Sequence, residues 1–179
     1  MPLCAVILCG VLASAQEAPG PRLLVTEANG AYEISLGVSR LALAIPKAQL
    51  VPSAAARGSS SPTYFSFDDR GSGLMVSGWF EPEQAFRGMD EFWKGEQRGL
   101  SQNGLRVQNV VRGQVGNWQV VFYDIVIPGG RSSNVRAELV QAGTWIDVHA
   151  SVTTKRSEAE NRQVLRDVLE AIRVEERPR

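Results

Sequence analysis

Cysteine and histidine are almost absent from this chain of 179 residues, which contains two cysteines and one histidine. Both cysteines, Cys4 and Cys9, lie within an apolar N-terminal stretch that we expect to be removed from the mature protein. The remaining chain would then have no thiol, which excludes disulfide bonds, cysteine nucleophiles and zinc sites built from cysteine. The composition therefore predicts a domain that is stabilised by its hydrophobic core, and we expect neither a metal nor a cofactor.

A surplus of charge is also lacking, because nineteen basic residues balance nineteen acidic ones. A basic surplus is what holds many proteins on nucleic acid or on anionic membranes. We therefore expect no nucleic-acid partner. Apolar residues make up 44% and charged residues 21% of the chain, as in ordinary globular proteins, and the length is sufficient for one domain with a substantial core.

The first fifteen residues have the composition of a secretory signal peptide. An uninterrupted apolar run extends from Leu3 to Ala13, and small residues occupy Ala13-Ser14-Ala15. This combination predicts cleavage after Ala15, although no lysine or arginine precedes the run. The run is too short for a membrane-spanning helix. We expect a periplasmic or secreted protein with residues 16–21 as a linker and with no stable membrane insertion after cleavage.

Short alternating segments bounded by turn residues predict a domain of mostly antiparallel strands over residues 22–175. Asn29-Gly30 separates the first two segments and is the strongest sequence signal for a two-residue hairpin turn. Residues 118–127 are apolar at successive positions, as expected for a strand that is covered on both faces. Residues 52–62 lack periodicity and predict a loop. The predicted strands are 22–28, 31–37, 41–47, 63–69, 74–80, 106–113, 118–127, 134–141 and 143–153.

Two segments instead have the spacing of amphipathic helices. Residues 82–98 place aromatic and aliphatic residues near one stripe, and residues 157–173 carry a second apolar stripe. Ser157 and Glu160 have the spacing of a capping box at the start of the second helix. Runs of strands with separate helices indicate an α+β fold, in which a mid-chain helix and a C-terminal helix pack on an antiparallel β-sheet.

The order of these elements resembles the PsbP-like fold. The resemblance rests on a short signal sequence, a strand that ends in Ile-Pro (LALAIP, residues 41–46), a hairpin, a helix, a meander of long strands and a C-terminal helix. It covers residues 22–175. This fold occurs in photosystem II extrinsic proteins, in a Ran-binding nuclear import factor and in bacterial secreted proteins. The resemblance implies a binding or scaffold role more often than catalysis, and it assigns no role to any single residue.

Asp147, His149 and Ser151 lie on one face of the last predicted strand, because alternate residues of a strand share a face. Such neighbours stand about 6.5–7 Å apart with parallel side chains, whereas a serine and its histidine base must approach to about 3 Å. The chain also lacks the G-x-S-x-G turn that exposes a serine nucleophile. We therefore expect no catalytic triad at this strand.

A metal site would have to combine His149 with carboxylates such as Asp124, Glu138 and Asp147. Transition metals commonly bind more imidazole or thiolate ligands than this set offers. Residues 71–78 are rich in glycine, but they lie between two predicted strands rather than before a helix. They therefore do not predict a phosphate-binding loop.

Two interpretations of the strand face remain. The face is either the solvated side of a sheet or a recognition surface in which tryptophans lie beside paired charges. On a solvated sheet, a cross-strand pair such as Arg136 with Asp147 stabilises the fold by roughly 0.2–1 kcal/mol. The candidate binding residues are Trp79, Arg136, Glu138, Trp145, Asp147 and His149.

The leading hypothesis is an exported, non-enzymatic binding or scaffold domain of the bacterial envelope, with a protein or a small molecule as its ligand. One alternative is a small hydrolase or lyase that uses His149 and carboxylates. Another is a chaperone or an immunity-type partner that holds a cognate protein with the sheet face or with residues 52–62. An enzyme is expected to hold His149 in a concave pocket with a shifted pKa, and a binding module is expected to present a flat aromatic patch.

Overall fold

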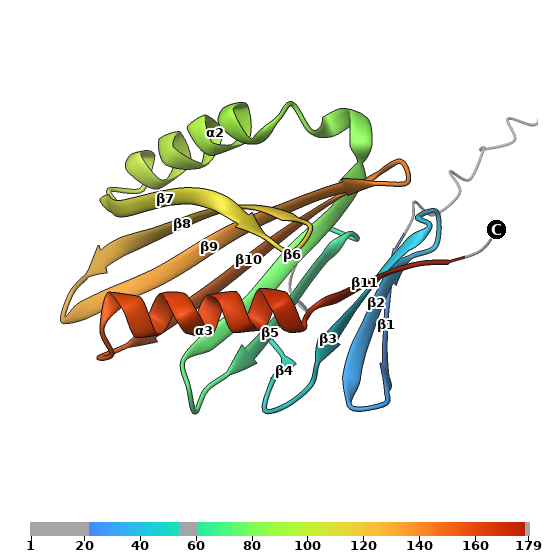
Figure 1. The fold of residues 1–179 in the computed structure, drawn as a ribbon, viewed down its shortest axis with the longest axis horizontal. Helices are drawn as coiled ribbons and strands as arrows, with labels where there is room; N and C mark the ends of the chain where they lie inside the picture. The colour runs from blue at the N-terminus through green and yellow to red at the C-terminus, as the bar shows by residue number, and fades with distance from the viewer. Residues whose placement is uncertain (1–21, 54–60, 178–179) are drawn as a thin grey trace, which may run out of the picture.

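In the part of the chain that the structure describes, two antiparallel sheets and two helices make up the fold (Figure 1). The computed structural model describes residues 22–53 and 61–177. The predicted signal peptide, the linker at 16–21 and most of the loop at 52–62 lie outside these residues. The predicted α+β fold, with a mid-chain helix and a C-terminal helix on antiparallel strands, is confirmed.

The smaller sheet has four strands in the order β1-β2-β3-β11. Asn29 and Gly30 form the predicted hairpin turn with φ angles of 51° and 72°, in the left-handed region that such a turn requires. The sequence pattern does not predict β11, because four residues after a helix are too few to distinguish a strand from a polar tail. The strands are β1 (Leu23–Ala28), β2 (Ala31–Leu36), β3 (Leu41–Pro46) and β11 (Arg173–Glu176).

The larger sheet has seven strands in the order β4-β5-β6-β10-β9-β8-β7. Strand β9 begins at Gly130 rather than at residue 134, because the turn before it consists of Pro128 and Gly129 alone. The strands are β4 (Val51–Pro52), β5 (Tyr64–Asp69), β6 (Leu74–Pro82), β7 (Val107–Val115), β8 (Trp118–Ile127), β9 (Gly130–Gln141) and β10 (Thr144–Thr154).

The mid-chain helix α2 (Met89–Gln102) starts later than the predicted residue 82. Pro82 has an extended backbone and ends β6, and a short 3-10 turn, η1 (Glu83–Ala85), follows it. Gly88 has a φ of 94°, which is outside the helical region, so a continuous helix cannot pass through this residue. The predicted helical spacing of apolar residues is right, and the predicted first residue of the helix is wrong.

The C-terminal helix α3 (Glu158–Ala171) begins with the predicted capping box. The Glu160 backbone N–H donates to Ser157 Oγ at 3.3 Å, and the Ser157 backbone N–H donates to the Glu160 carboxylate at 2.9 Å. These two bonds satisfy backbone amides that the first turn of a helix leaves without partners. The apolar stripe of α3 is buried at Leu165 and Leu169.

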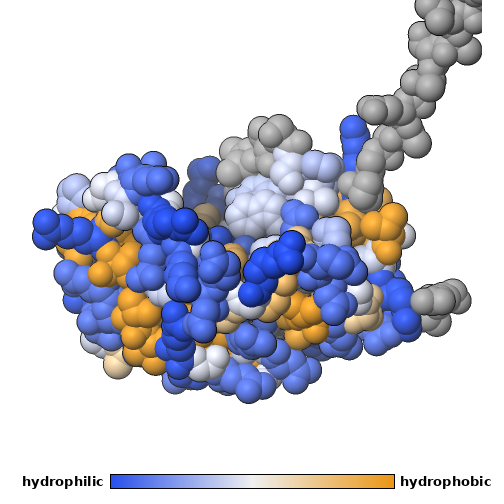
Figure 2. Space-filling view, turned by 90° about the horizontal axis from the view of Figure 1, so that it is seen from above, coloured by the Kyte–Doolittle hydropathy of each residue, from blue (hydrophilic) through white to orange (hydrophobic). Residues whose placement is uncertain are grey.

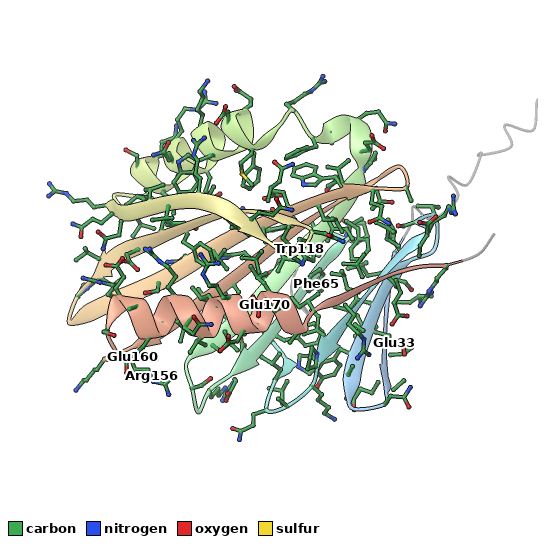
Figure 3. All side chains as sticks on the ribbon, viewed as in Figure 1. Glu33, Phe65, Trp118, Arg156, Glu160 and Glu170 are labelled. Atoms are coloured by element: carbon green, nitrogen blue, oxygen red, sulfur yellow. The ribbon has the colours of Figure 1, made fainter. Side chains whose placement is uncertain are left out.

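The larger sheet is covered on both faces. One face packs against α3 and the small sheet in the main core, to which Phe65 and Trp118 (Figure 3) belong. The other face carries α2, whose Trp93 packs with Val121 and Tyr123 of β8. Strand β8 is therefore buried on both sides, as its sequence predicts. Among the described residues, no helix is long and apolar enough to cross a membrane.

Candidate functional site

Two rows of polar and aromatic side chains cross the middle of the large sheet, on the face that carries α2. Each row runs across β5, β6, β10 and β9, and the second row lies two residues along each strand from the first. The alternation of strands puts both rows on the same face. The first row is Ser66, Ser77, His149 and Arg136, and the second row is Tyr64, Trp79, Asp147 and Glu138.

The structure brings all six predicted residues together. Five of them belong to the two rows, and Trp145 lies on the same face of β10, two residues before Asp147. The Trp145 Nε1–H donates to Glu138 Oε2 at 2.5 Å, and its ring packs against Phe86 and Phe92, with centroids 5.3 and 6.1 Å away. Strand alternation, which is visible in the sequence, places the candidate residues of each strand on one face, and the pairing of β6, β10 and β9 brings these residues together.

The charged residues of the rows are buried, so the interpretation as a solvated sheet face is wrong. Arg136, Glu138 and Asp147 expose 8%, 1% and 5% of their surface. The physical reason is α2, which brings the Glu96 carboxylate and the Phe92 ring onto Arg136. The surface on the α2 side is mainly hydrophilic (Figure 2), and the charged rows lie beneath it.

Arg136 is the centre of this cluster. Its Nη2 lies 3.1 Å from Glu96 Oε2, and its Nη1 lies 3.5 Å from Asp147 Oδ2. Its guanidinium carbon lies 5.6 Å from the centroid of the Trp79 ring and 5.2 Å from that of the Phe92 ring. A guanidinium between two aromatic faces is held by ring electrostatics as well as by carboxylates. Arg136 therefore joins β9, β10, β6 and α2.

Glu138 and Asp147 form a buried acid pair. They lie opposite each other on β9 and β10, and both are buried. Burial, and then the charge of Asp147, raise the pKa of Glu138 well above its usual range. Burial raises the pKa of Asp147 to about 6, although the charge of Arg136 opposes this shift. Because Arg136 faces three carboxylates, protonation of Glu138 or Asp147 reduces the buried negative charge.

Each of the two carboxyl groups also has one oxygen without a partner. Glu138 Oε1 and Asp147 Oδ1 are buried and have no hydrogen-bond partner among the described residues. A buried carboxylate oxygen without a partner costs free energy, and the cost is greater when the group is charged. The raised pKa values agree with this environment, because burial disfavours the charged form of both groups.

His149 is held in its neutral form. Its Nε2 lies 3.2 Å from Asn134 Oδ1. An amide oxygen can only accept, so Nε2 carries the proton. Burial, and then the charge of Arg136, lower the pKa of His149 to about 3. Within the described part of the chain, the ring bonds Asn134 rather than Asp147 or Ser151, so the residues of the rejected triad do not interact as a triad.

This geometry favours a structural role over catalysis. A base with a pKa of about 3 is too weak to take a proton efficiently at neutral pH. Glycoside hydrolases keep their two carboxyl groups about 5–9.5 Å apart to leave room for the sugar or water. Glu138 and Asp147 instead expose only 1% and 5% of their surface, so a substrate has no access to the pair. The cluster holds α2 on the sheet, and its charged groups form ion pairs with one another.

Glu96 and Phe92, which α2 contributes to the cluster, are not among the candidate residues that the sequence predicts. Glu96 follows Trp93 by three residues, so both lie on the same side of α2, and Trp93 is buried. A glutamate within the apolar stripe of a helix is the signal that would have identified it. Its cation, Arg136, lies forty positions away on another element, so the pairing itself depends on the tertiary fold.

Asp124 lies apart from Glu138 and Asp147, so the three carboxylates considered for a metal site do not converge. Asp124 accepts from Asn109 Nδ2 at 2.8 Å and lies 3.5 Å from Arg131, in a separate network at the start of α3. Among the described residues, no group of three or more acidic, histidine or cysteine side chains is arranged to hold a metal ion.

A pocket of about 290 Å³ opens between α3 and the junction of the two sheets, away from the polar rows. Gln49, Asp69 and Asp167 are the polar side chains of its lining. Small-molecule pockets are mostly apolar, carry a few polar groups and have volumes from about 300 Å³ upward, so this pocket is at the lower end of that range. The apolar lining includes Ile45, Pro46, Leu50, Leu74, Val164 and Val168.

The sequence gives no signal for this pocket, because its walls come from segments far apart in the chain. The end of β3 and the turn after it form one wall, the β5–β6 hairpin forms another, and the C-terminal half of α3 forms the third. The carbonyl oxygen of Leu50 accepts from the Tyr32 hydroxyl at 3.0 Å, which fixes the turn against the small sheet.

Comparison of the sequence with protein-family models and with curated proteins finds no match.

Proposed function

We propose that this chain is an exported, non-enzymatic binding domain and that it binds a small, largely apolar molecule in the pocket beside α3. The observation that carries the proposal is the pocket itself, with its apolar walls and a few polar groups. The signal-peptide pattern supports a periplasmic or secreted location. The resemblance to PsbP-like proteins supports a binding or scaffold role.

The size of the pocket limits the ligand. One water molecule occupies about 30 Å³ of liquid, so the pocket has room for about ten non-hydrogen atoms. An eight-carbon chain that buries roughly 200 Å² of apolar surface gains about 5 kcal/mol at 25 cal/mol per Å². Part of this gain is lost to immobilisation, so we expect a dissociation constant of about 1 mM for such a probe.

The experiment is an NMR titration of the full chain with 1-octanol. We expect the methyl resonances of Leu74, Val164 and Val168 to shift in a saturable manner. The variant Ala171→Phe places a large ring at the pocket lining and should weaken binding at least about tenfold. Ala159→Phe introduces the same ring on an exposed position of α3 outside the pocket lining and is the matched control.

Two results would contradict the proposal. The first is an unchanged spectrum of the pocket methyl groups at millimolar octanol. The second is equal octanol binding by Ala171→Phe and Ala159→Phe, because octanol would then bind elsewhere.

A hydrolase is the second candidate function, and the acid pair is the observation that favours it. Two neighbouring carboxyl groups with raised pKa values can supply an acid and a base to the same site. This candidate predicts slow turnover of an activated ester or peptide substrate, which Asp147→Asn abolishes without unfolding the protein. Turnover that survives in Asp147→Asn would exclude the pair as its source.

A further inference from the structure

The pocket beside α3 carries negative charge on two of its walls. Asp69 ends β5 and Asp167 lies on α3, and both line the pocket. Among the described lining residues there is no lysine, arginine or histidine. We propose that the ligand of this pocket is a small amphiphile with a cationic head, such as an alkylammonium or arylalkylammonium compound. This inference rests on the proposed function and adds the charge of the ligand to it.

Asp69 is a fixed carboxylate. Its Oδ1 accepts the backbone N–H of Gly71 at 2.8 Å, and its Oδ2 accepts the Ser72 hydroxyl at 2.6 Å. The hydrogen bond from Ser72 makes the largest contribution to lowering the pKa of Asp69 below its usual value, so the group is charged at neutral pH. The turn after β5 thus holds a negative charge in a defined orientation at the pocket.

A second acceptor lies close to Asp69. A Cβ atom on Gly71 would lie 3.3 Å from Asp69 Oδ1 and 3.6 Å from Gln49 Oε1, so both oxygens approach the same point. Oxygens that accept hydrogen bonds attract an ammonium group, which has donors and no acceptor. An anionic head beside these two lining residues would meet a carboxylate and an amide oxygen.

Asp167 adds its charge from the opposite wall. It is exposed on α3, and its Oδ1 accepts from Gln163 Nε2 at 2.7 Å. Two basic residues next to the lining in sequence are engaged elsewhere, because Lys47 pairs with Glu27 and Arg166 lies 4.9 Å from the Phe122 ring centroid. Arg70 follows Asp69 but is exposed and does not line the pocket. The described lining therefore contains no cation that neutralises the two carboxylates.

Charge complementarity sets the size of the expected preference. An exposed ion pair is typically worth up to about 1 kcal/mol, so two carboxylates should favour an ammonium head over a neutral head by roughly 5–25-fold. An anionic head should bind more weakly than the neutral one, because the two carboxylates repel it. Salt should reduce the preference, because the carboxylates are accessible to solvent.

The experiment compares three probes with the same chain: octylammonium, 1-octanol and octanoate, each titrated into the full protein at low and at high salt. We expect octylammonium to bind at least about fivefold more tightly than octanol, and octanoate to bind most weakly. Asp167→Asn should reduce the octylammonium preference and leave octanol binding unchanged. Glu170→Gln removes a carboxylate on the same helix that does not line the pocket, and it should change neither affinity.

The outcomes separate this inference from the proposed function. Equal binding of octylammonium and octanol, or tighter binding of octanoate, would overturn the cationic ligand and leave the apolar binding site intact. Failure of all three probes to shift the pocket methyl groups would overturn both proposals. Pocket resonances that change with protein concentration in the absence of probe would identify a second copy of the chain as the occupant and would also overturn the inference.

Discussion

The buried neutral histidine gives this protein a measurable dependence of stability on pH. The folded protein keeps the pKa of His149 at about 3, whereas the unfolded chain has the ordinary value of 6.5. Between these two values the unfolded chain binds a proton that the folded protein does not bind. The contribution of His149 to the free energy of unfolding is therefore complete above pH 6.5 and is lost as the pH falls toward 3.

Each pH unit in this window is worth about 1.4 kcal/mol, so His149 should cost the wild-type protein about 3 kcal/mol at about pH 4.5 relative to neutral pH. A minor part of the residue remains exposed, which makes this figure an upper value. Asp147 acts in the opposite direction. Its raised pKa contributes stability that is present below its unfolded value of 3.8 and is lost as the pH rises through about 6. The two effects oppose each other in the wild-type protein.

The variant His149→Gln isolates the histidine, because Asp147 and Glu138 are retained in both proteins. The measurement is urea unfolding of wild type and variant at several pH values, followed by tryptophan fluorescence. We expect the stability of the variant, relative to wild type, to increase by up to about 3 kcal/mol between neutral pH and about pH 4.5. A difference that stays constant within about 0.5 kcal/mol would refute a buried neutral His149. An imidazole NMR titration of the wild type gives the folded pKa directly.

Three further predictions concern the fold. Arg136→Met removes the cation of the buried cluster and should cost about 3–5 kcal/mol in urea unfolding; a loss below about 1 kcal/mol would contradict the pairing described. Gly78→Ala would place a Cβ atom 2.2 Å from the carbonyl oxygen of Asp147 and should lower the free energy of unfolding by about 1–3 kcal/mol. Gly95→Ala on α2 would place a Cβ atom with no other atom within 4 Å and should raise the free energy of unfolding by up to about 1 kcal/mol. Equal effects at the two glycines would disprove the close approach at β6. Ser157→Ala should cost about 1 kcal/mol in thermal unfolding through loss of the capping box, and an unchanged melting temperature would contradict this.

The sequence predicted the local features of the fold because these depend on neighbouring residues. Asn29-Gly30 forms a hairpin turn through its own backbone preferences, and Ser157 caps α3 through a residue three positions away. Strand alternation placed the candidate binding residues of each strand on one face, because a strand has a period of two. The start of α2 was wrong because the apolar spacing continues through Gly88, whose positive φ interrupts the helix.

Only the tertiary structure decided what those elements do together. The sequence places Arg136, Glu138 and Asp147 on a common face, but the docking of α2 makes that face an interior one and supplies Glu96. Burial then raises the carboxyl pKa values and lowers that of His149, because desolvation depends on all the elements that surround a group. The pocket beside α3 exists only where three distant segments meet, and no local pattern records such a meeting. Local chemistry fixed the elements and their faces, and packing fixed which faces lie against one another and what space remains between them.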